Sequence, residues 1–149
     1  MRMKASRILE TSLYTSDLPA AENFYLHVLG LEPFSRVAGR HLFYKIGNAM
    51  LLIFNPEKSR KASGDVPPHG AEGPGHVAFS VRETELDDWR EHLARQRVEI
   101  EAEIAWPGGG YSLYFRDPAG NSVELATPLT WGMEDQDTPH GTVQTRPAN

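Results

Sequence analysis

The stretch GNSVELAT, residues 120–127, matches an earlier stretch of the same chain, GNAMLLIF at residues 47–54, at an offset of 73 residues. A second pair accompanies it at an offset of 66 residues, because HVAFSVRE (76–83) aligns with ETSLYTSD (10–17). Repetition at a nearly fixed period indicates that a chain is built from copies of one supersecondary unit. The 149 residues therefore predict two similar modules in tandem.

The first module reads as a strand, a helix and three further strands. The helix is predicted between Asp17, a good N-cap residue, and Gly30, a residue typical of the position after a helix. Gly47 and Asn48 form a hairpin-type turn between the last two strands. The predicted strands cover residues 8–15, 31–37, 41–46 and 49–54.

The second module repeats this order. A strand at 75–81 precedes a helix at 83–96, whose acidic first turn and basic end complement the helix dipole. Three strands are predicted to follow, at residues 98–104, 111–116 and 121–127. Residues 56–74, between the modules, hold four prolines and are predicted to be a linker.

Together these elements predict an α+β fold, in which two βαβββ modules form a curved mixed sheet with helices outside and a concave cleft. A single domain is expected over residues 1–128, with modules at about 7–55 and about 75–128. Residues 129–149 are expected to form a C-terminal tail.

The composition excludes several classes of function. With a formal net charge of −5 and no cluster of Lys and Arg, the chain lacks the basic face of a nucleic-acid-binding protein. It contains no cysteine, which excludes thiolate nucleophiles and disulfides. No apolar run is long enough to cross a membrane and no secretory signal is recognised, so we expect a cytoplasmic protein with a small-molecule partner.

Three ligand-type side chains are predicted to share one face of the sheet. Strand alternation places Glu10, His76 and Glu124 opposite the apolar residues that would pack beneath the helices. In the repeat, His76 corresponds to Glu10, and Glu124 corresponds to Leu51. If two like modules pack side by side, equivalent positions meet around one cleft. The three side chains are therefore expected to converge there.

A divalent metal ion explains why two carboxylates would face one cleft. A buried carboxylate is costly unless it is paired or binds a metal, and two of them repel each other. One imidazole and the carboxylates of Glu10 and Glu124 suit Mn, Fe, Ni, Co or Zn ions, among which the sequence does not choose. Because Leu51 cannot bind a metal, coordination positions would stay open for substrate or water.

Three motifs resemble the vicinal oxygen chelate superfamily, which includes glyoxalases, fosfomycin-resistance proteins, extradiol dioxygenases and bleomycin-resistance proteins. They are LYTSDLPAAENFYLHVLGL (13–31), GPGHVAFSV (73–81) and LYFRDPAGNSVELATP (113–128). The resemblance, which covers residues 7–128, implies metal ligands at Glu10, His76 and Glu124, and it implies a homodimer. It departs from the common pattern at Glu10, where such proteins usually carry a histidine.

The resemblance further implies a metal-dependent enzyme that chelates vicinal oxygens of a small substrate and stabilises an enolate or oxyanion, with Glu10 or Glu124 as the base. We expect lyase or isomerase chemistry of the glyoxalase type, and thiol transfer and extradiol dioxygenation stay open. The alternative is a protein that sequesters a small molecule without catalysis, as bleomycin-resistance proteins do. The residues expected to line the cleft and bind substrate are His41, Phe43, Ser112, Tyr114 and Arg116.

Overall fold

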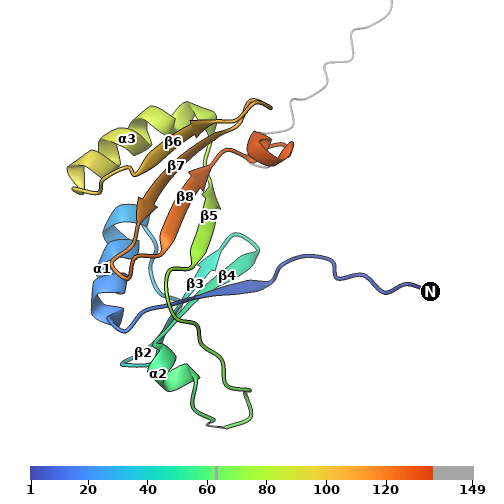
Figure 1. The fold of residues 1–149 in the computed structure, drawn as a ribbon, viewed down its shortest axis with the longest axis vertical. Helices are drawn as coiled ribbons and strands as arrows, with labels where there is room; N and C mark the ends of the chain where they lie inside the picture. The colour runs from blue at the N-terminus through green and yellow to red at the C-terminus, as the bar shows by residue number, and fades with distance from the viewer. Residues whose placement is uncertain (63, 136–149) are drawn as a thin grey trace, which may run out of the picture.

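The computed structural model describes residues 1–62 and 64–135, and it contains two four-stranded mixed sheets (Figure 1). The strand order is β1-β4-β3-β2 in the first sheet and β5-β8-β7-β6 in the second. The strands are β1 (Glu10–Tyr14), β2 (Ser35–Val37), β3 (His41–Ile46), β4 (Ala49–Phe54), β5 (His76–Ser80), β6 (Ala102–Ala105), β7 (Tyr111–Arg116) and β8 (Ser122–Ala126). The predicted α+β fold of tandem βαβββ modules is confirmed, although each module has a sheet of its own.

The register of the strands corrects one detail of the predicted repeat. The first strand of each module, β1 or β5, pairs in parallel with the last strand, β4 or β8. Glu10 lies opposite Met50, and His76 lies opposite Ser122. Met50 and Ser122 are therefore equivalent, at an offset of 72 residues (122 minus 50). The position that matches Glu124 is Leu52 (124 minus 72), not Leu51 as the letter alignment indicated. Leu52 is equally unable to bind a metal.

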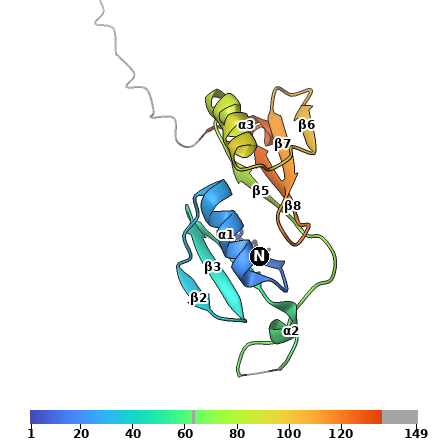
Figure 2. The ribbon, with the colours of Figure 1, turned by 90° about the vertical axis from the view of Figure 1, so that its left-hand side faces the viewer.

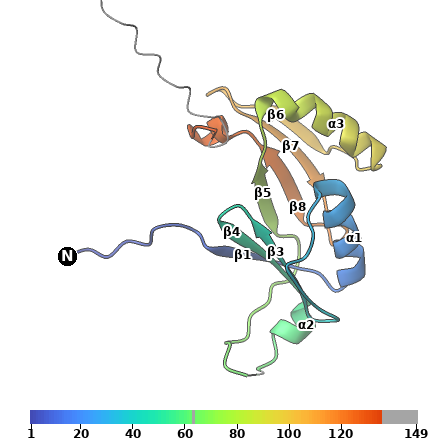
Figure 3. The ribbon, with the colours of Figure 1, turned by 180° about the vertical axis from the view of Figure 1, so that it is seen from behind.

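Each sheet carries one long helix, and both helices lie on the same side of the molecule (Figures 2 and 3). In the first module, α1 (Leu18–Leu29) begins after Asp17, whose carboxylate accepts a hydrogen bond from Ala20 N at 3.0 Å. It ends at Gly30, which has the left-handed φ of 68° that favours glycine. In the second, the single turn η1 (Glu83–Glu85) leads into α3 (Leu86–Arg95).

The hydrophobic core is continuous between the two modules. Apolar residues of alternate strand positions face the helices and join one cluster that includes Leu51, Ile53, Val123 and Leu125. The ring centroids of Phe24 in α1 and Phe115 in β7 lie 6.2 Å apart, so the first helix also packs against the second sheet. Because one face of each sheet packs in this core, the predicted ligands lie on the opposite face.

The segment between the modules includes, in its described parts, a short helix and contacts to the first sheet. It begins with a short helix, α2 (Pro56–Ser59), because Pro56 follows the N-cap residue Asn55. Farther along, the ring of His69 bonds the hydroxyl of Tyr14 at 2.7 Å and packs against Phe54 with centroids 4.6 Å apart. The linker is therefore tied to the first sheet.

Beyond the second sheet, η2 (Pro128–Trp131) opens the predicted tail, and residues 136–149 of that tail lie outside the described residues. No helix in the part of the chain that the structure describes is long and apolar enough to cross a membrane.

Candidate metal centre

Two of the three predicted ligands meet on the second sheet. His76 starts β5 and Glu124 lies in the middle of the neighbouring strand β8, and both project from the face that α3 does not cover. Their side chains approach within 3.2 Å, measured from His76 Nε2 to Glu124 Oε2. Half of the His76 side chain is exposed, whereas Glu124 is buried. A metal ion from solvent could therefore reach the pair from the side of His76.

The hydrogen bonds of His76 determine which of its nitrogens is free. Nδ1 lies 3.0 Å from the carbonyl oxygen of Ser122, and a carbonyl only accepts, so Nδ1 carries the proton. In a neutral imidazole, Nε2 then carries no proton, and its lone pair faces the Glu124 carboxylate. Two electron pairs repel at this distance, so a proton or a metal cation belongs between them. A backbone carbonyl that fixes the tautomer is also the usual partner of metal-binding histidines.

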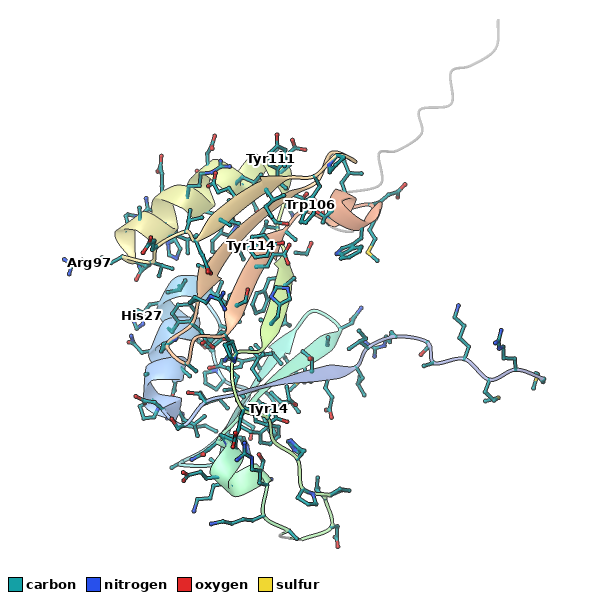
Figure 4. All side chains as sticks on the ribbon, viewed as in Figure 1. Tyr14, His27, Arg97, Trp106, Tyr111 and Tyr114 are labelled. Atoms are coloured by element: carbon teal, nitrogen blue, oxygen red, sulfur yellow. The ribbon has the colours of Figure 1, made fainter. Side chains whose placement is uncertain are left out.

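Ser112 and Tyr114, two residues expected to bind substrate, lie beside Glu124. Ser112 in β7 is completely buried and donates to Glu124 Oε1 at 2.5 Å. Tyr114, labelled in Figure 4, pairs directly with Glu124 in the ladder. Its ring stacks on that of His76, with centroids 6.4 Å apart and an interplanar angle of 23°. Burial, followed by the neighbouring Glu124 carboxylate, raises the pKa of Tyr114 above its ordinary value of 10. The phenol therefore keeps its proton at neutral pH and can donate it.

The third predicted ligand, Glu10, is not part of this cluster within a single chain. It stands exposed at the start of β1, opposite Met50. Across residues 1–62 and 64–135, no three His, Cys, Asp or Glu side chains gather closely enough to hold a metal ion. The structure therefore joins His76 and Glu124 but does not bring Glu10 to them within the described residues of one chain, and the convergence of all three stays a prediction.

His41 and Phe43 belong to the first sheet rather than to the Glu124 cluster. They stack with centroids 3.7 Å apart on the face opposite α1. His41 is buried, and its ring nitrogens are engaged by Ser35 and by Arg40. Burial and then the Arg40 charge lower the pKa of His41 below 6.5. The ring is therefore neutral at pH 7.

Arg116 was predicted to bind substrate but lies away from the Glu124 cluster, whereas Trp106 was not predicted and contacts it. Arg116, expected to bind substrate, is exposed and forms a two-pronged ion pair with Glu101. Trp106 was not singled out, yet its indole nitrogen donates to Ser112 at 2.9 Å and so reaches the ligand cluster. The only trace of this in the sequence is a tryptophan that follows a strand and precedes a glycine-rich turn, which is too common a pattern to be specific.

Residues 7–125 match the family model described as the Glyoxalase/Bleomycin resistance protein/Dioxygenase superfamily. The chain belongs to this superfamily. The match spans both modules and ends just after Glu124, so it includes all three predicted ligands. The predicted family resemblance is thereby confirmed.

Within the superfamily, the chain is similar to proteins with different names. A crystal structure of lactoylglutathione lyase from Agrobacterium tumefaciens is 44% identical, with a TM-score of 0.84 over 88% of this chain and 100% of that one. A glyoxalase/bleomycin resistance protein/dioxygenase from Nocardioides is 25% identical, with a TM-score of 0.68 over 85% of each chain. The metallothiol transferase FosB of Shouchella clausii is 30% identical over 120 residues, which are 75% of this chain and 73% of that protein.

Proposed function

We propose that the protein is a metal-dependent enzyme that acts on a small, oxygen-rich substrate by lyase or isomerase chemistry of the glyoxalase type. The observation that carries the proposal is the 3.2 Å approach of His76 Nε2 to Glu124 Oε2. A divalent cation would take the place of a proton between these atoms and would be bound by both. The 44% identity to a lactoylglutathione lyase supports this class of reaction over the others.

The donor set fits a borderline divalent ion. One imidazole nitrogen and one carboxylate oxygen suit Zn, Ni, Fe, Mn or Co, as the sequence indicated. When bound, such an ion polarises a substrate carbonyl or hydroxyl and stabilises the negative charge that develops on it.

The third ligand is proposed to come from a second copy of the chain. Glu10 is exposed, and it follows two exposed apolar residues, Ile8 and Leu9, which are 79% and 58% exposed. Neighbouring exposed apolar side chains are the kind of surface that a second copy of the chain could cover. In a homodimer that buries them, Glu10 of one copy would complete the His76 and Glu124 pair of the other.

The chain supplies the remaining chemistry around this cluster. Glu124 is buried and acceptor-only, and it or Glu10 is proposed to remove the substrate proton as a general base. Tyr114, with its raised pKa, stays protonated and is proposed to hydrogen-bond a substrate oxygen. Ser112 donates its hydroxyl proton to Glu124, so we propose that it positions Glu124 rather than binding substrate.

Thiol transfer is the second candidate, since the chain is 30% identical to two proteins named metallothiol transferase. Dioxygenation and metal-free sequestration remain the further alternatives. The assay that separates them uses protein loaded with each of the five metals and offers an α-keto hemithioacetal, an epoxide with a thiol, or a catechol with oxygen.

The proposal expects isomerisation of the hemithioacetal to a thioester, lost in Glu124→Ala. Turnover of the epoxide alone would transfer the assignment to thiol transfer, and turnover of the catechol alone would transfer it to dioxygenation. Tight binding of a small molecule without turnover under any metal would support sequestration.

A further inference from the structure

A chain of hydrogen bonds leads from Glu124 to an indole at the end of the second sheet. Trp106 Nε1–H donates to Ser112 Oγ at 2.9 Å, and Ser112 Oγ donates to Glu124 Oε1 at 2.5 Å. An indole nitrogen only donates and a serine has one hydroxyl proton, so the direction of both bonds is fixed. Oε1 of Glu124 therefore already accepts one hydrogen bond, which fixes the rotation of the carboxylate, and Oε2 is the oxygen that faces His76.

The backbone fixes each member of this chain in place. Trp106 opens a turn that its own peptide groups close: its N–H bonds the Gly110 carbonyl at 2.8 Å and its carbonyl accepts from Gly109 N–H at 2.9 Å. Ser112 has no exposed surface and Glu124 is 7% exposed. Hydrogen bonds in such surroundings are stronger than in water and lock both side chains in one orientation. Figure 4 shows Trp106 beyond the Tyr114 position, toward η2.

We propose that Trp106 and Ser112 are positioning residues that present a single oxygen of Glu124, Oε2, to the metal. This inference rests on the proposed function, because it assumes that Glu124 is a ligand. If Glu124 held the metal through Oε2 alone, more of the metal would stay open to a chelating substrate. A second consequence is that metal binding at Glu124 should change the environment of the Trp106 indole N–H, which is two hydrogen bonds away.

A purely structural role makes a different prediction. If the two bonds only stabilise the turn and the sheet, their removal lowers the free energy of unfolding and leaves metal affinity unchanged. If they orient Glu124, affinity falls even when the variant is fully folded. Partners of metal ligands typically contribute about 10-fold or more to affinity.

The first test measures the zinc affinity of the full chain by competition with a chromogenic chelator. We expect Ser112→Ala to bind Zn²⁺ about 10-fold more weakly than the wild type. Trp106→Phe, which keeps an apolar ring and removes the N–H, should weaken binding by a smaller factor. The matched controls are Ser80→Ala, an exposed serine in β5, and Trp131→Phe, an exposed tryptophan in η2, and neither should change the affinity.

The second test needs no variant and therefore decides the matter if Ser112→Ala does not fold. In the wild type, ¹⁵N-labelled on its indoles, zinc should shift the Trp106 Nε1–H resonance and leave that of Trp89 in place. A wild type that binds zinc with no Trp106 shift, or a folded Ser112→Ala of unchanged affinity, overturns the inference alone. A wild type that binds no divalent metal overturns the proposed function as well.

Discussion

Tyr25 in α1 donates a hydrogen bond of 2.9 Å to Oδ2 of Asp117, which lies in the turn between β7 and β8. The bond joins the first module to the second in the middle of the core, where Tyr25 has no exposed surface. Burial and then the Asp117 charge raise the pKa of Tyr25 far above its ordinary range, so the phenol is always a donor. The same carboxylate accepts from Asn121 Nδ2 at 2.9 Å.

Loss of this hydroxyl should destabilise the whole domain. We expect Tyr25→Phe to lower the free energy of unfolding by about 1–3 kcal/mol, because a buried carboxylate loses one of its donors. Urea denaturation followed by circular dichroism measures the change. Tyr111→Phe is the control at an exposed tyrosine of β7 and should change stability by less than about 0.5 kcal/mol. Equal stabilities for both variants would show that the Tyr25–Asp117 bond contributes nothing.

Two glycines of one turn should respond in opposite ways to an added methyl group. A Cβ on Gly110 would fall onto the backbone of Thr130, whereas one on Gly108 would meet no atom within 4 Å. Gly110→Ala should therefore cost about 3 kcal/mol or more, since backbone cannot move aside as a side chain does. Gly108→Ala should be neutral or slightly stabilising. Thermal unfolding of both variants tests this, and a stable Gly110→Ala would mean that η2 does not pack against the turn.

His41 should make the protein less stable in mild acid. Its folded pKa is lowered by burial and then by Arg40, from an unfolded value near 6.5. Below that pH the unfolded chain takes up a proton that the folded chain does not, so stability falls as pH falls from about 6.5 toward the folded pKa. Unfolding measured from pH 7.5 to pH 5 should show a shallower loss in His41→Gln than in the wild type. Parallel curves would contradict a buried, neutral His41.

A mixed dimer tests whether the site is shared between chains. Glu10→Ala and Glu124→Ala should each be inactive as homodimers. When the two variants are co-expressed with different tags and isolated as a heterodimer, one of the two sites regains both carboxylates. About half of the wild-type activity per dimer is then expected. No recovery would mean that Glu10 does not act across the interface.

The sequence predicted the elements best where apolar runs end at clear turn residues. Strands β3, β4 and β7 begin and end at the predicted residues, because clear turns bound the apolar runs there. The edge strands β2 and β6 were predicted too long. Pro33 has no N–H to give to a ladder, and Val98 and Ile100 pack on the core from a loop rather than from a strand.

For the candidate site, the sequence predicted which residues share one face of the sheet but not how they are assembled. Face parity placed His76 and Glu124 together, and the structure joins them at 3.2 Å. Parity fixes only which face of a sheet a residue occupies, and a repeat shows only which positions are equivalent. Neither says whether two faces meet within one chain or between two. The location of Glu10 relative to the pair was therefore beyond the sequence, as was the bond from Trp106, which depends on the path of a turn.

Metal content measured by mass spectrometry, on protein purified without chelators and reloaded with each of the five divalent ions, tests the central claim most directly. We expect about one ion per chain in the wild type, and in Ser80→Ala, the control on the same strand. His76→Ala and Glu124→Ala should retain almost none while staying folded, since each removes one side of the Nε2–Oε2 contact. A folded wild type that binds none of these ions, or variants that bind as much as the wild type, would contradict a metal between His76 and Glu124.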